Sequence, residues 1–147
     1  MTLDGNQLRR LATAPDDSLP LVRQLWLESP SIDDEAIADL DRWKKLDSLV
    51  VIRGEITDNG LAQLSRLAGL IYLHVEGCPG VTDAGLAHLR SLQQLRLLTV
   101  LDTNAAPASG KKLQEFLPKC HIMVGPRGGL IYEGGPLPKF HQNHNRQ

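Results

Sequence analysis

The sequence LIYLHVEGCPGVTDAGLAHL, residues 70–89, contains the pattern that decides the fold. Apolar and polar residues alternate around Leu73 and Val75, as in a half-buried β-strand whose successive side chains point to opposite faces. The apolar spacing then changes to three residues at Leu86 and Leu89, which is typical of one side of a helix. The stretch therefore predicts a strand, a turn and a helix in this order.

The same pattern recurs along the chain at a nearly constant interval. Segments of the form L-x-x-L-x-L, with Val at some positions, start at residues 22, 46, 70 and 95, so the intervals are 24, 24 and 25 residues. Each is followed by apolar residues at helical spacing: Ile37, Leu40 and Trp43; Leu61, Leu64 and Leu67; Leu86, Leu89 and Leu92; Leu113 and Phe116. Such a period indicates stacked repeats. We expect an α/β fold of about four strand-turn-helix units, with a parallel sheet on the concave face, helices on the convex face and terminal caps.

An acidic residue stands at one place in three of these units. Asp83 comes directly before a helical apolar pattern, and Asp58 and Asp34 have the same offset in the preceding units. Since Asp is a preferred N-cap residue, we expect these carboxylates to cap helices, and we favour capping over catalysis. Ser109 is expected to cap a last helix that begins near Lys111.

Residues 78–89, CPGVTDAGLAHL, resemble the cysteine-containing subtype of the leucine-rich repeat family, whose pattern is L-x-x-L-x-L-x-x-C-x-x-I-T-D-x-x-L-x-x-L. The resemblance covers about residues 22–122, and the closing LPKCHI, residues 117–122, is similar to the final repeat of short bacterial members. The other units lack the cysteine and hold Pro30, Gly54 or Thr103 in its place. The resemblance implies a solenoid and a recognition scaffold, without implying a particular activity.

The repeats divide the chain into three parts. We expect an N-terminal capping helix and linker at 1–21, a repeat domain at 22–122 and a Gly/Pro-rich segment with a disordered tail at 123–147. The units of the repeat domain lie near 22–45, 46–69, 70–94 and 95–122. The helix expected within residues 3–13 would protect the edge of the first strand, and residues 130–132 would add a short strand.

Composition restricts the class of partner and the compartment. The formal net charge is -1, from 16 basic and 17 acidic residues without a run of either sign. Nucleic acid and anionic membranes are therefore not expected as partners, because both favour a basic stripe. No apolar run approaches the roughly 18 residues that span a bilayer, and the N-terminus lacks a secretory pattern. We expect a cytoplasmic protein in which Cys78 and Cys120 are buried thiols.

Catalytic and metal sites find little support in the sequence. His141 and His144 lie in a polar tail, and neither His121 nor Cys120 completes a structural zinc pattern with them. The glycine-rich residues 125–129 lack the Lys-Ser/Thr ending of a phosphate-binding loop. No serine or cysteine has an identifiable partner base. We expect no enzyme activity, no cofactor and no metal.

The outward strand positions form the candidate site, because a solvated sheet face is normally polar and this one is rich in apolar residues. The predicted partner-binding residues are Trp26, Glu28, Val50, Ile52, Tyr72, His74, Glu76, Leu97 and Leu101. We expect another protein, of unknown identity, to bind them. Alternatively, the C-terminal segment covers this face, the chain dimerises edge to edge, or it is a structural module or an adaptor subunit of a larger assembly. F-box relatives of the repeat subtype suggest the adaptor alternative, but no F-box-like segment is visible.

Overall fold

One parallel sheet organises the protein. The computed structural model describes residues 1–19 and 21–127 and the backbone of residues 132–134. The sheet contains six parallel strands in chain order, β1 to β6, and β7 pairs antiparallel with β6. The strands are β1 (Thr2–Leu3), β2 (Gln24–Glu28), β3 (Ser48–Ile52), β4 (Tyr72–Glu76), β5 (Leu97–Leu101), β6 (His121–Gly125) and β7 (Tyr132–Gly134).

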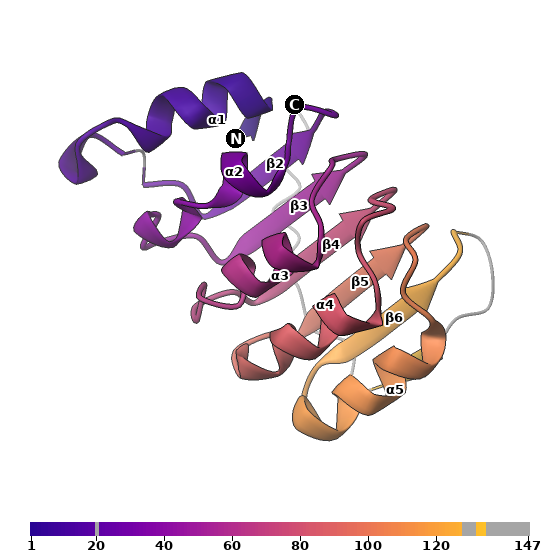
Figure 1. The fold of residues 1–147 in the computed structure, drawn as a ribbon. Coiled ribbons are helices and arrows are strands. Elements are labelled where there is room, and N and C mark those ends of the chain that lie inside the picture. Colours follow the sequence, from indigo (N-terminus) through magenta and orange to yellow (C-terminus); the bar gives the residue numbers. More distant parts are fainter. Residues whose placement is uncertain (20, 128–131, 135–147) are drawn as a thin grey trace, which may run out of the picture.

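Helices connect the strands and cover one face of the sheet. Figure 1 shows α2 to α5 side by side in front of the strands that they connect. The helices are α1 (Gly5–Ala12), α2 (Asp34–Ile37), α3 (Asp58–Leu64), α4 (Asp83–Ala87) and α5 (Pro107–Phe116), with short 3-10 helices η1 (Asp16–Ser18), η2 (Leu40–Arg42) and η3 (His88–Ser91). Among the described residues, no helix is long and apolar enough to cross a membrane.

The core lies between the sheet and these helices. Two residues of each strand from β2 to β6 point into it and form two rows across the sheet: Leu25, Leu49, Leu73, Leu98 and Ile122, then Leu27, Val51, Val75, Val100 and Val124. All ten are buried. The helices add leucines at the predicted spacing, among them Leu61, Leu86 and Leu113. The strand register is the predicted one, so the alternating residues point away from the helices.

The helix caps differ from the prediction. Thr57 and Thr82, rather than the aspartates that follow them, are the N-caps of α3 and α4, and their hydroxyl oxygens accept backbone N–H groups of the first turn. In the first unit the cap is Asp33, one residue before Asp34. The expectation was wrong because the Thr or Asp one residue earlier has the extended backbone that a cap requires.

The following aspartates instead connect one repeat to the next. Asp58 accepts the backbone N–H of Thr82 at 2.7 Å and its hydroxyl at 2.5 Å. Asp34 accepts the same two groups of Thr57, at 2.8 and 2.5 Å. A threonine hydroxyl can accept from the helix and donate to the carboxylate at once, whereas an ionised aspartate in its place can only accept. The Thr-Asp pair therefore caps one helix and attaches the next unit.

The last helix lacks a side-chain cap. α5 begins at Pro107 with Ala106 as its N-cap, so the predicted cap at Ser109 is wrong. Ser109 lies inside the first turn and donates its hydroxyl to the carbonyl of Ala106 at 2.6 Å. Proline is suited to the first helical position because its φ angle is already helical and its missing N–H would have no helical partner there.

The two ends extend the sheet. β1 pairs with the outer edge of β2, so a two-residue strand occupies the edge that α1 was expected to protect. α1 packs beside α2, and its Arg9 donates to both carboxylate oxygens of Asp33 at 2.6 and 2.7 Å. β6 runs across the domain boundary predicted at residue 122. β7 includes Tyr132, but Leu130, Ile131 and the disordered tail predicted at residues 141–147 lie outside the described residues.

Candidate functional site

The nine predicted site residues share the sheet face that points away from the helices, called here the opposite face. It consists of the outward side chains of β2 to β5 in three rows: Gln24, Ser48, Tyr72 and Leu97; Trp26, Val50, His74 and Thr99; Glu28, Ile52, Glu76 and Leu101. Because the strands are parallel and in register, residues from four repeats become direct neighbours. The structure thus brings together on one face residues that are up to 77 positions apart in the sequence, from Gln24 to Leu101.

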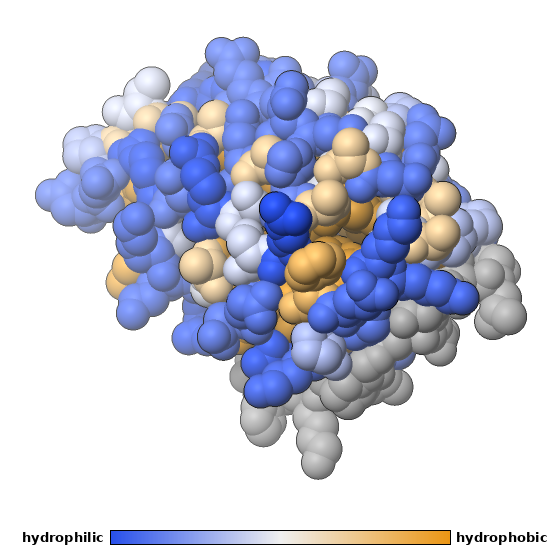
Figure 2. Space-filling view, turned by 60° about the horizontal axis from the view of Figure 1, so that its bottom comes forward, coloured by the Kyte–Doolittle hydropathy of each residue, from blue (hydrophilic) through white to orange (hydrophobic). Residues whose placement is uncertain are grey.

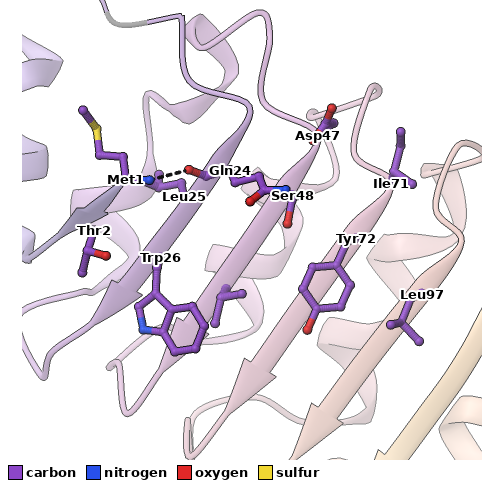
Figure 3. Close-up of a pocket in the computed structure, with 11 residues that line it drawn as sticks. Met1, Thr2, Gln24, Leu25, Trp26, Asp47, Ser48, Ile71, Tyr72 and Leu97 are labelled. Atoms are coloured by element: carbon purple, nitrogen blue, oxygen red, sulfur yellow. Dashed lines mark hydrogen bonds between the residues drawn. The ribbon is translucent and has the colours of Figure 1, made fainter. Parts of the chain in front are cut away.

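An apolar hollow of about 670 Å³ lies at the start of the strands. Figure 3 shows the rings of Trp26 on β2 and Tyr72 on β4, with β3 between the two strands that carry them. Ser48 and Val50 of β3 also line the hollow, and Figure 3 shows Leu97 beyond Tyr72. Trp26 is 43 % exposed, whereas Val50 is buried. The hollow is therefore a depression with aromatic side chains at its walls and the buried Val50 at its base.

Met1 and Ile71 also line this hollow and were not predicted. Together with Trp26 they account for three of the five large hydrophobic side chains that are exposed in the described chain. The N-terminal amine donates to the carbonyl of Gln24 at 3.0 Å, which holds Met1 beside β2. Sequence patterns do not reveal these residues, because β1 is only two residues long and Ile71 comes just before its strand. Figure 2 shows how hydrophilic most of the surface is, with hydrophobic side chains grouped near the middle of that view.

A second, polar hollow of about 570 Å³ lies at the other end of the strands. Trp26, Val50 and Tyr72 line both hollows, so the two are neighbours on the opposite face. Seven of its lining residues belong to the predicted set: Trp26, Glu28, Val50, Ile52, Tyr72, His74 and Glu76. Leu101 is on the same face, half-buried, but lines neither hollow.

Ion pairs fix the carboxylates of this polar hollow. Glu28 pairs with Arg53 and accepts the indole N–H of Trp26 at 3.2 Å. Glu76 accepts from Arg127 at 2.8 Å. Arg53 and Arg127 were not predicted as site residues. Each follows the end of a strand by one or two residues, beyond the alternating positions from which the site was predicted.

The loop positions after β3, β4 and β5 adopt an unusual backbone. Arg53, Gly77 and Asp102 have φ angles of 52°, 67° and 50°, in the left-handed region that favours glycine. Their N–H groups donate to the next strand at Glu76, Leu101 and Gly125. This geometry turns the chain sharply at the end of each strand. It also places the side chains of Arg53 and Asp102 at the border of the polar hollow.

A hydrogen-bonded chain of side chains crosses from β4 to β5. His74 contacts Glu76 through Nε2 at 3.0 Å and Thr99 through Nδ1 at 2.7 Å. The carboxylate can only accept, so in the neutral ring Nε2 donates to it and Nδ1 accepts the threonine hydroxyl. Tyr72 is also hydrogen-bonded to Thr99; burial raises the pKa of its phenol, and this bond partly opposes the rise.

The order hydroxyl, imidazole and carboxylate resembles that of a nucleophile, its base and an orienting acid. Thr99, however, is only 4 % exposed, and its hydroxyl is surrounded by the partners just named. Strand N–H groups nearby are used in the sheet, so they cannot stabilise an oxyanion. The arrangement is suited to holding Tyr72 and His74 in fixed orientations on the opposite face.

The cysteines are buried, as predicted, and their thiols are not activated as nucleophiles. Burial raises the pKa of Cys78, and it raises that of Cys120 to about 12, despite the nearby charge of Arg96. A raised pKa keeps the thiol protonated and therefore a poor nucleophile. In the described part of the chain no group of three metal-binding side chains comes together, and His141 and His144 lie outside that part.

A smaller hollow of about 390 Å³ lies on the helical side, between α4 and α5. Its lining includes Ala84, Ala87 and the exposed ring of Phe116, with the guanidinium of Arg90 5.9 Å from the ring centre. A cation over an aromatic ring is a stabilising contact at an exposed site. None of the predicted site residues is part of this hollow.

The geometry of the site is the basis for its interpretation. No protein-family model matches the sequence. The assignment of a role therefore depends on the shape, charge and composition of the surfaces described above.

Proposed function

We propose that the chain is a short leucine-rich repeat solenoid that recognises another protein, without catalysis, through the opposite face. The solenoid part is supported by the strand-turn-helix units stacked in chain order. It is also supported by the hydrogen bonds that Asp34, Asp58 and Asp83, the first residues of α2, α3 and α4, accept from the following unit. In such a stack the strand side chains of all units form one continuous surface, on which a partner can contact several repeats at once.

The observation that carries the recognition proposal is the state of Trp26. This indole is 43 % exposed on a sheet face, and beside it lie an apolar hollow on one side and a polar hollow on the other. Its N–H is already bonded to Glu28, which orients the ring before any partner arrives. Exposed, oriented tryptophans with a polar border are typical of the few residues that supply most of the affinity of an interface.

Affinity capture from the native lysate tests this proposal. The bait is the full chain, compared with a Trp26→Ala/Tyr72→Ala variant whose folding is checked by circular dichroism. The matched control removes aromatic and cationic groups from the helical side as Phe116→Ala/Arg90→Ala. We expect a protein captured by the wild type and the control and lost with the first variant, because truncating two central aromatics commonly weakens an interface by about tenfold or more.

Three results would contradict the proposal. Capture that survives Trp26→Ala/Tyr72→Ala but not the control would move the site to the α4–α5 side. Capture unaffected by both variants would assign it to the ends of the chain. If no protein were captured at stoichiometric amounts, a structural role or a face covered from within the chain would become the better account.

A further inference from the structure

In each of three ion pairs around the opposite face, the arginine is the more exposed partner. Arg23 pairs with Asp47 near the apolar hollow, and the pairs Arg53–Glu28 and Arg127–Glu76 border the polar one. The three arginine side chains are 71–73 % exposed, whereas their carboxylate partners are only 13–36 % exposed. A ligand that approaches this face therefore meets guanidinium groups first. Elsewhere the order is mixed, and in Arg9–Asp33 and Arg42–Asp16 the carboxylate is the more exposed partner.

The inner carboxylates hold these arginines in place without removing their capacity to bind. A guanidinium has five N–H donors, and a carboxylate uses at most two of them. Because these three side chains are largely exposed, acceptor oxygens of a ligand can reach the remaining donors of Arg23, Arg53 and Arg127. The arginines lie beyond both ends of the strands, with the apolar hollow between them. The face thus presents three exposed guanidinium groups around an aromatic depression. The exposed carboxylate of Asp102, which accepts the backbone N–H of Arg127 at 2.8 Å, lies at the border of the polar hollow.

We propose that the partner binds through an extended acidic segment that carries one bulky apolar side chain. That side chain fills the depression between Trp26 and Tyr72, and Asp or Glu residues on either side of it contact the arginines. The inference rests on the proposed function and specifies its partner. Bidentate pairing suits arginine and carboxylate geometry, so acidic residues complement this border better than neutral ones do.

The dimensions of the sheet fit this segment. Strands two positions apart are separated by about 9.5 Å, which leaves room for one side chain between rings that stand on β2 and β4. A five-residue strand is about 17 Å long, so its ends lie about 8 Å from its centre. In an extended partner segment this distance corresponds to two or three residues. The expected motif therefore has acidic residues about two or three positions before and after the apolar anchor.

Single-stranded nucleic acid would also combine negative charge with stacking on aromatic rings. Three observations favour a protein segment. The depression has aliphatic walls in Ile71 and Leu97. Each arginine is paired with a carboxylate, so the face offers separate cationic groups and lacks the continuous basic groove that follows a phosphate backbone. The whole chain carries a formal charge of -1, without the long-range basic field that favours nucleic acid.

Selection from a displayed library of random 12-residue peptides tests the proposal on the full chain. We expect enriched peptides to contain Trp, Phe or Leu flanked by Asp or Glu at the spacing given above. The best of these, made as a labelled peptide, should bind about tenfold more weakly to an Arg53→Gln/Arg127→Gln variant and severalfold more weakly when NaCl is raised from about 50 to 500 mM. The control Arg66→Gln/Arg90→Gln makes the same change of charge on the helical side and should leave binding within about twofold.

The possible outcomes separate this inference from the proposed function. Selected peptides that need Trp26 and Tyr72 but are neutral or basic would overturn the acidic partner and leave recognition by the face intact. If no peptide is enriched, or if binding ignores Trp26→Ala/Tyr72→Ala, both proposals fail. Tighter binding of the oligonucleotide dT12 than of any peptide, with the same dependence on Arg53 and Arg127, would replace the protein partner by nucleic acid.

Discussion

At Gly85, in the middle of α4, an added Cβ would lie 2.3 Å from Oδ1 of Asp58 in the preceding repeat. Gly60 has the same relation to Asp34, also at 2.3 Å. Helix propensity alone favours alanine over glycine by about 1 kcal/mol at such positions. The steric effect has the opposite sign and is larger, because the carboxylate is held by its two bonds to Thr82. These glycines therefore allow the contact between repeats.

Gly85→Ala should consequently lower the free energy of unfolding by about 1–3 kcal/mol, the usual cost of inserting a group into a packed site. Gly69→Ala is the matched control, since the nearest atom to its Cβ would be 4.0 Å away. Urea denaturation measures both variants. An Asp58→Ala/Gly85→Ala double variant should lose less stability than the two single changes added together. Stabilisation by Gly85→Ala would show that this contact between repeats is absent.

The buried thiol of Cys120 predicts a stability change at high pH. Its pKa is about 12 when folded and 9.0 as an ordinary thiol, so unfolding releases the thiol to ionise more easily. Because the folded pKa is the higher one, the buried thiol contributes its full stabilisation below about pH 9. This contribution is lost as the pH rises towards 12. The loss from this group alone is roughly 1 kcal/mol at pH 10. Denaturation between pH 8 and 10 should show this slope, and Cys120→Ala should flatten it; an equal slope in both would contradict the assignment.

Single residues differ in how well the sequence predicts them. The faces of Leu73 and Trp26 follow from alternation, because a strand side chain has only two directions. The role of Asp58 does not follow from the sequence pattern. N-cap preference concerns contacts within one helix, whereas Asp58 bonds to Thr82 of the next repeat. Arg127 also escapes prediction, because its contact with Glu76 joins residues 51 positions apart.

At the scale of an element, β4 shows how one strand divides core from surface. Leu73 has no exposed area between the neighbouring strands and the helices, whereas Tyr72, His74 and Glu76 point to the opposite face. The strand limits of β2 to β5 follow the predicted repeat, because each carries the same apolar alternation. β1 has two residues and gives no periodic signal, and β6 was divided by the boundary expected at residue 122.

Two substitutions, one on β4 and one on β2, test this division. Leu73→Asp should prevent folding, because it removes about 1.5–3 kcal/mol of apolar burial and places an unpaired charge in the core. Trp26→Ala should shift the thermal midpoint by only about a few degrees, since much of the indole is already exposed. Circular dichroism during heating measures both. Comparable destabilisation by the two variants would mean that Trp26 belongs to the core.

Across the whole molecule, the helices gather on one side of a single sheet and leave the strand side chains of four repeats on the other. The repeat period predicts this arrangement, because every unit returns the chain to the same edge. It does not predict the polar hollow or the position of Arg53 at its border, which depend on the loop conformations at Arg53, Gly77 and Asp102. The shape of the polar end of the face therefore comes from the turns, whereas the position of the face comes from the repeat.

Photo-crosslinking in the native lysate tests the central claim, that the opposite face is the recognition surface, most directly. A benzophenone amino acid replaces Tyr72 in one variant and the exposed His88 on the helical side in another. Our account predicts that irradiation yields a covalent protein adduct from position 72 and none from position 88, and that Trp26→Ala reduces the adduct. Adducts from position 88 alone, or from neither position, would contradict it.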